Sequence, residues 1–134
     1  MQKGIPLPLA AVDNQRSMVG LGNLCDFLSV CVGHPAAAGE IFLISDGQDL
    51  STPELLGKIA RCMGRSPRLW PLPETMLNGL ATLMGKRPSL SRLTGSLQLD
   101  IGKARFWLGW RPPVTVDEEI ARTVSWFTKF VSSP

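Results

Sequence analysis

The sequence predicts a small α/β fold, arranged as a compact α+β domain. Two observations support this prediction. Several helix-length segments carry an apolar stripe and end at capping residues, and short apolar runs of strand length lie between them. The chain has 134 residues, of which 44% are hydrophobic and 19% charged. This is enough for one domain with a hydrophobic core, but too little for a complete doubly wound nucleotide-binding sheet.

The first half of the chain begins with a proline-rich extended segment at residues 4–14. A short strand is expected at residues 15–19, followed by a helix at residues 23–32 with one apolar stripe. Gly33, His34 and Pro35 should end this helix, which gives the lone histidine a capping or surface role. The run EIFLIS at residues 40–45 predicts a buried strand.

The second half contains several residues that mark where helices begin or end. Ser51 and Glu54 form a capping box for a helix to about residue 63, and Thr115 and Glu118 form another for the C-terminal helix. Gly109 is placed to end a helix at residues 101–108. A third strand is expected at residues 68–72 and a further helix at residues 73–84. Apolar and polar residues alternate at residues 96–100, and this run ends on Asp100, which is suited to cap the helix that follows.

The composition excludes several classes of protein. No apolar run approaches the roughly 20 residues of a membrane helix, and the N-terminus does not have the pattern of a signal peptide. Cys25, Cys31 and Cys62 form no C-x-x-C pair, so we expect free thiols in a reducing cytoplasm and no metal site.

The net charge of +3 is unevenly distributed along the sequence. Residues 58–111 contain ten Lys and Arg residues and two acidic ones, whereas the rest contains four basic and nine acidic residues. Such a segment is either a solvated face or a surface that meets phosphate. Its basic residues at Lys58, Arg61, Arg65 and Arg68 are spread along helices without interleaved exposed aromatics, which argues against a platform for single-stranded nucleic acid.

The stretch MVGLGNLCD at residues 18–26 begins like a dinucleotide-binding loop but departs from that pattern. A working fingerprint needs a third glycine, and Cys25 stands in its place. Catalytic groups are also missing. The chain contains no tyrosine and one histidine, and the acidic residues 117–119 suit a helix N-terminus. The sequence therefore predicts no active site, no cofactor site and no catalytic residue in this chain.

Three segments of the chain resemble a known family. They are IPLPLAAVDNQRSMVGLGNLCDFL, GEIFLISDGQDLSTPELLGKIARCMGR and GSLQLDIGKARFWLGWRPPVTVDEEI. Together they are similar to the C-terminal part of NAD-dependent sugar-nucleotide epimerases and dehydratases, extended short-chain dehydrogenases whose best-known member is UDP-glucose 4-epimerase. The resemblance implies that residues 1–134 are the substrate-binding domain of a larger two-domain enzyme.

The resemblance also implies roles for individual residues. Arg16 matches an arginine that contacts the substrate diphosphate, although it could instead be an exposed arginine beside Asp13. The second such arginine is Arg92, or else Arg87. Leu97 falls near the position that limits the 2-substituent of the sugar, or is a buried strand leucine. Leu7 and Pro8, with Leu9, match the loop whose backbone pairs with uracil. Gly20 and Gly22 depart from the family, which has an aromatic residue or histidine and then aspartate there.

The implied function is to grip a nucleotide-diphosphate sugar, with a UDP-sugar as the expected substrate, while a Rossmann domain with bound NAD transfers hydride at C4 of the hexose. Polysaccharide biosynthesis is the expected context. The expected partners are this substrate and the chain's own Rossmann domain, with no nucleic acid and no membrane. The alternative is a stand-alone, non-catalytic module that binds nucleotide sugars or another protein.

Overall fold

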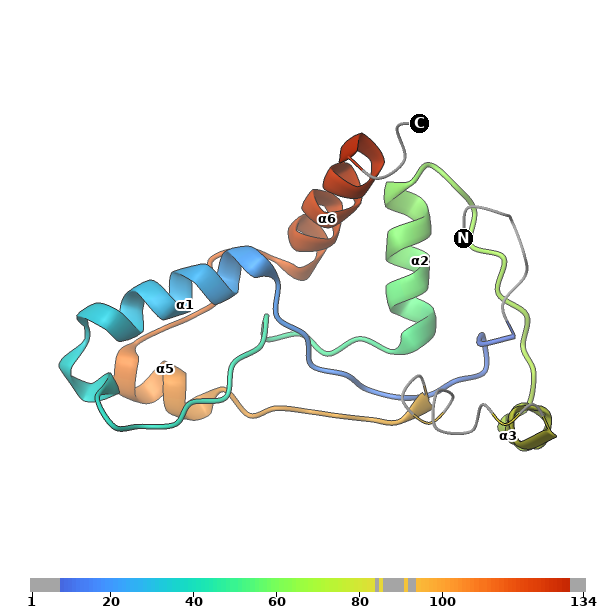
Figure 1. The fold of residues 1–134 in the computed structure, drawn as a ribbon, viewed down its shortest axis with the longest axis horizontal. Coiled ribbons are helices and arrows are strands. Elements are labelled where there is room, and N and C mark those ends of the chain that lie inside the picture. The colour runs from blue at the N-terminus through green and yellow to red at the C-terminus, as the bar shows by residue number, and fades with distance from the viewer. Residues whose placement is uncertain (1–7, 84, 86–90, 92–93, 131–134) are drawn as a thin grey trace. The chain divides into compact units, whose positions relative to one another are not determined.

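The computed structural model of the chain describes residues 8–83, 85, 91 and 94–130. Its elements, in chain order, are α1 (Leu21–Gly33), the 3₁₀ turn η1 (Pro35–Ala37), α2 (Thr52–Cys62), α3 (Glu74–Leu83), α5 (Gly102–Leu108) and α6 (Val116–Phe130) (Figure 1). They divide into two compact units. Unit 1 comprises Met1–Arg16 and Leu50–Leu97, and unit 2 comprises Ser17–Asp49 and Gln98–Pro134.

The predicted helices are confirmed, with shifts of a few residues at their ends. Ser51 caps α2 through the complete capping box: its hydroxyl accepts the Glu54 N–H, and the Glu54 carboxylate accepts the Ser51 N–H at 2.7 Å. Thr115 and Glu118 repeat this arrangement at α6. In both boxes the hydrogen bonds donated by the capping residue lower the pKa of the glutamate, because they stabilise its carboxylate form.

Two further helix ends form as the sequence predicts. Gly109 adopts the left-handed conformation with φ of 64° directly after α5, which a glycine does at no steric cost. His34 is the C-cap of α1, and its Nδ1 accepts the N–H of Ala36 at 3.2 Å. The start of α5 differs from the prediction: the N-cap residue is Ile101, and Asp100 Oδ1 accepts the N–H of Gly102 at 2.7 Å from one position earlier in the chain.

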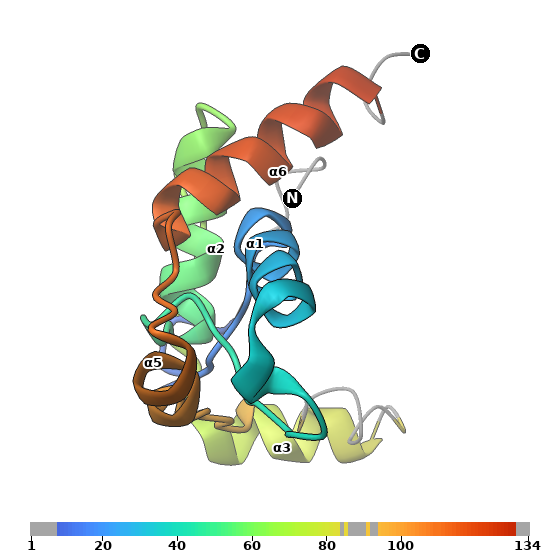
Figure 2. The same ribbon diagram turned by 90° about the vertical axis from the view of Figure 1, so that its left-hand side faces the viewer.

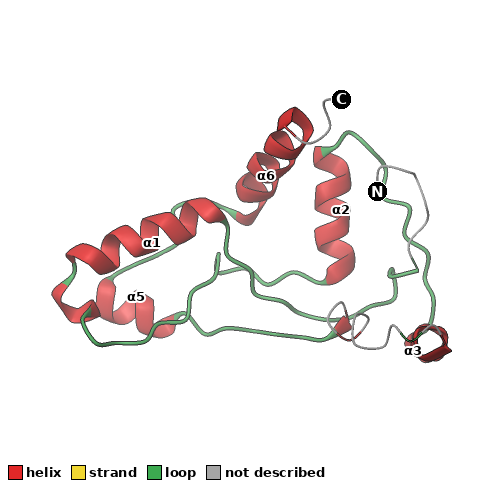
Figure 3. Cartoon of the chain, viewed as in Figure 1, coloured by secondary structure: helices red, strands yellow, loops and turns green. Residues whose placement is uncertain are grey.

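The predicted α/β fold is wrong. The chain is 51% helix and 4% strand, and the described residues form no sheet (Figure 3). Arg16 makes two isolated bridges, antiparallel to Leu50 and parallel to Leu97. The segments predicted as strands are extended and are drawn as loops.

These segments form no sheet because the backbone hydrogen bonds between them do not continue from one residue pair to the next. Beyond the Arg16–Leu50 pair, Asp46 N–H bonds to the Met18 carbonyl at 2.7 Å, but the N–H of Leu99 bonds to the Ser17 hydroxyl instead of a backbone carbonyl. Residues 40–45 keep the alternation of a strand, with Phe42 and Ile44 packed inward and Ile41 and Leu43 exposed. The Ile41 carbonyl accepts its hydrogen bond from a side chain, Lys103 Nζ.

Each unit has its own core. In unit 1, Leu9, Val12 and Leu77 are buried together, with Leu56 and Leu72 packed against them. In unit 2 one buried hydrophobic cluster consists of Phe27 of α1, Ala104 and Leu108 of α5, and Trp110. The Phe27 and Trp110 rings meet edge to face at 5.0 Å, and η1 contacts both α1 and α5 (Figure 2).

Candidate functional site

The structure describes three of the five residues predicted to bind substrate. Leu7 and Arg92 lie outside the described residues, as does Arg87. Pro8 is half-buried at the start of the described chain, and its neighbour Leu9 is buried in the core of unit 1. The Leu9 side chain packs inward and is therefore not available to a ligand.

Arg16 and Leu97 are brought together in unit 1. They form the parallel bridge, and the Leu97 N–H donates to the carbonyl of the preceding residue, Gln15, at 2.9 Å. The Leu97 side chain is 53% exposed, so the alternative of a buried strand leucine is wrong. Arg16 is half-buried.

Arg16 is held through both its backbone and its side chain. Its N–H and carbonyl bond reciprocally to Leu50, each at 3.0 Å, directly before the residue that caps α2. Its guanidinium Nη1 donates to the Gly95 carbonyl at 3.2 Å. A planar guanidinium has five N–H donors in a fixed fork, which suits it to pair with two phosphate oxygens.

The charge around this arginine favours an anionic ligand. Unit 1 contains nine Lys and Arg residues and three acidic ones, whereas unit 2 contains five basic and eight acidic residues. The summed potential of such a distribution attracts anions and steers them at long range. The basic stretch noted in the sequence therefore belongs mainly to the unit that carries Arg16.

The Glu119 side chain occupies the space beside the turn at Gly20 and Gly22. A Cβ atom built on either glycine would overlap the Glu119 side chain, which is 6% exposed. The Gly20 N–H donates to both carboxylate oxygens of Asp46, at 2.9 and 3.0 Å. Two carboxylates thus occupy the N-terminus of α1, and these residues do not fit a pyrophosphate. The glycines serve close packing.

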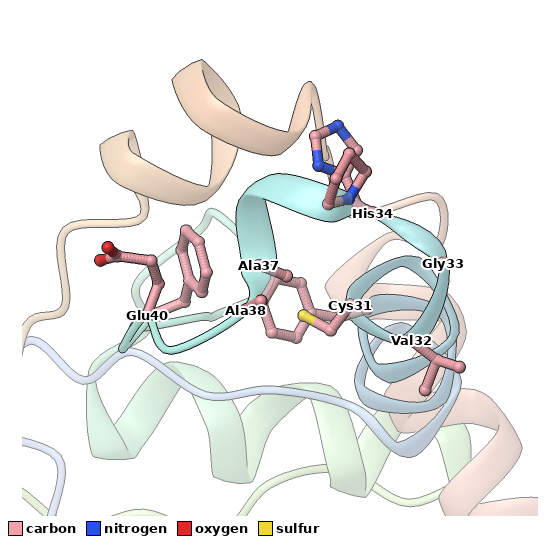
Figure 4. A pocket seen from close by; sticks show the side chains of 10 residues that line it. Cys31, Val32, Gly33, His34, Ala37, Ala38 and Glu40 are labelled. Atoms are coloured by element: carbon pink, nitrogen blue, oxygen red, sulfur yellow. The ribbon is translucent and has the colours of Figure 1, made fainter.

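A half-open hollow of about 450 Å³ lies at the C-terminal end of α1 in unit 2 (Figure 4). Phe27, Cys31 and Phe42 line it, together with His34 and Glu40. The Glu40 carboxylate is paired with Lys103 at 2.7 Å, and His34 caps η1. Within the described part of the chain, no three potential metal ligands gather, and no helix is long and apolar enough to cross a membrane.

Comparison with known proteins finds similarity to an epimerase. Over 128 residues, which are 95% of this chain, the sequence is 39% identical to UDP-glucose 4-epimerase of Vibrio cholerae. The chain is an epimerase-like domain. It is also 28% identical over 137 residues to the uncharacterized protein y4nL of Sinorhizobium fredii, across 87% of this chain. No family model and no solved structure matches the sequence.

The epimerase-like domain spans only part of these relatives: 39% of the length of the Vibrio protein and 37% of the Sinorhizobium protein. The match confirms the resemblance noted from the sequence and is consistent with a C-terminal part of an epimerase.

One residue of the epimerase-like domain's site was missed by sequence reasoning. Asn14 is 1% exposed and hydrogen-bonds to both Thr52 and Gly95. Nothing local marks it, because it lies in an extended polar run, DNQR, and its partners are 38 and 81 residues away. The capping box at Ser51 predicts where α2 and its first residue, Thr52, begin, but it does not predict that Asn14 bonds to Thr52.

Proposed function

We propose that this epimerase-like domain binds the substrate of an NAD-dependent nucleotide-sugar epimerase, and that Arg16 grips the nucleotide diphosphate. The observation that carries the proposal is the fixed position of Arg16 beside the half-exposed Leu97 in the basic unit. A diphosphate pairs well with a guanidinium fork, and an adjacent exposed leucine can limit the space beside the attached hexose. The Vibrio relative supplies the substrate class, a UDP-hexose.

In this proposal each residue has a separate task. The Arg16 guanidinium pairs with two phosphate oxygens, and Arg92 is the second arginine on the same diphosphate. Leu97 limits the space at the 2-position of the sugar. The backbone of Leu7 and Pro8 meets the uracil edge, which agrees with the inward packing of the neighbouring Leu9 side chain.

We assign NAD and hydride transfer at C4 of the hexose to a companion Rossmann domain. The turn at Gly20 and Gly22 supports this division, because the Glu119 carboxylate fills it. This chain's contribution is to bind and orient the substrate. Orientation of this kind can supply a large part of a rate enhancement without any group that reacts.

The test is an assay of the protein expressed from its complete gene. We expect interconversion of UDP-glucose and its C4 epimer, and a reading frame that encodes a glycine fingerprint and a Tyr-x-x-x-Lys pair. A complete gene that encodes no such domain, and a product without this activity, would refute the epimerase assignment and favour the stand-alone binding module.

The exposed apolar side chains of unit 2 discriminate between these alternatives. Val32, Ile41 and Phe106 are each more than 80% exposed (90%, 82% and 89%). A domain that packs on a partner should expose apolar side chains as a continuous patch, whereas an independent module should not. We therefore expect the isolated 134-residue chain to self-associate in sedimentation velocity as its concentration rises. A monomer over the whole concentration range would contradict this expectation.

A further inference from the structure

The Gly95 carbonyl is an acceptor that two side chains share. Arg16 Nη1 donates to it at 3.2 Å and Asn14 Nδ2 at 3.1 Å. Both donors come from one extended segment, and both reach a residue about 80 positions away in the sequence. Any shift of this carbonyl therefore changes the position of the guanidinium.

The Asn14 side chain is held at several points. Its side chain is almost fully buried, at 1% exposure. Its Oδ1 accepts the N–H of Thr52 at 2.8 Å, in the first turn of α2, and its Nδ2 also donates to the Thr52 hydroxyl at 3.1 Å. A buried amide held on both sides in this way stays in one orientation, because any other orientation would leave buried polar groups unpaired.

Gly95 is also constrained from its other side. Its N–H donates to the Ser91 carbonyl at 2.9 Å, and a Cβ atom at Gly95 would lie 2.8 Å from that same oxygen. The turn is therefore closed so tightly that only glycine fits without a backbone shift. The position of the shared carbonyl depends on Asn14 on one side and on this turn on the other.

We propose that Asn14 is a positioning residue for substrate binding: through the shared Gly95 carbonyl it sets where the Arg16 guanidinium meets the diphosphate. This inference rests on the proposed function. A long arginine side chain loses rotamer freedom when it binds, and a preset position removes part of that cost before the ligand arrives. Displacing such a group by about 1 Å can cost about 100-fold in rate.

The experiment compares UDP with uridine, titrated into the protein expressed from its complete gene. Asn14→Ala should weaken UDP binding about tenfold and leave uridine binding unchanged, because only UDP carries the diphosphate. Gly95→Ala, which should displace the shared carbonyl while Asn14 and Arg16 are both still present, should show the same selective loss. Ser29→Ala is the control: Ser29 is an exposed residue of α1 in unit 2 whose hydroxyl bonds within its own helix, so this change should alter neither affinity.

The outcomes separate this inference from the proposed function. If Arg16→Ala leaves UDP binding unchanged, the proposed role of Arg16 is wrong. If Arg16→Ala weakens UDP binding but Asn14→Ala and Gly95→Ala do not, the positioning role is wrong. Equal losses for UDP and uridine in Asn14→Ala would also overturn it, since they would indicate a general effect on the fold.

Discussion

Replacing Arg16 with alanine should raise the KM of the full-length enzyme for its nucleotide sugar by about 50-fold, since a charged hydrogen-bonded contact of this kind contributes about 2 kcal/mol or more. The reason is that the guanidinium is held at the Gly95 carbonyl in the more basic unit and is the strongest phosphate donor among the described site residues. Steady-state kinetics with UDP-glucose measure the effect.

Two further variants give the Arg16 prediction its controls. Arg16→Lys keeps the charge but loses the planar fork, so its KM should lie between those of the wild type and Arg16→Ala. Arg111→Ala removes an exposed arginine of unit 2 and should leave the kinetics unchanged. If KM and kcat/KM are the same in Arg16→Ala as in the wild type, Arg16 does not bind the diphosphate.

Replacing Asn23 with alanine should lower the free energy of unfolding by about 4 kcal/mol, because each buried polar group left unpaired costs about 1–3 kcal/mol. Asn23 is fully buried, at 0% exposure. Its Nδ2 donates to Asp46 Oδ1 at 2.7 Å and to the Val114 carbonyl at 2.8 Å, and its Oδ1 accepts the Val114 N–H at 2.9 Å. It thereby joins α1 to the segment before α6.

Urea unfolding of the two proteins measures this loss. Ser29→Ala is the matched control, because Ser29 lies on the same helix, is exposed, and bonds only to the Cys25 carbonyl of its own helix in the described contacts. The control should stay within about 0.5 kcal/mol of the wild type. A loss below about 1 kcal/mol in Asn23→Ala would show that the network contributes little to stability.

Local chemistry made the helices predictable. The capping boxes at Ser51 and Thr115, and the left-handed glycine at Gly109, depend on residues within one turn of each other. The strands were mispredicted for the opposite reason. The alternation at residues 40–45 correctly separates Phe42 from Ile41, but a ladder needs a partner whose position no local pattern reveals.

The same distinction applies to the site. The family resemblance selected Arg16 and Leu97, and the structure brings them together. It did not select Asn14 or Gly95, whose contacts join distant parts of the sequence. Glu119 was expected only to suit a helix N-terminus. Its burial against Gly20 follows from the packing of α6 on the turn before α1, which is a tertiary contact.

The most direct test of the central claim is to map UDP binding by the amide chemical shifts of the ¹⁵N-labelled protein expressed from its complete gene. If this domain grips the diphosphate through Arg16, UDP should shift the amides of Gln15, Arg16 and residues 95–97, and uridine should shift them much less. If UDP leaves these amides unchanged while it binds elsewhere in the protein, the account given for Arg16 and its supporting residues is contradicted.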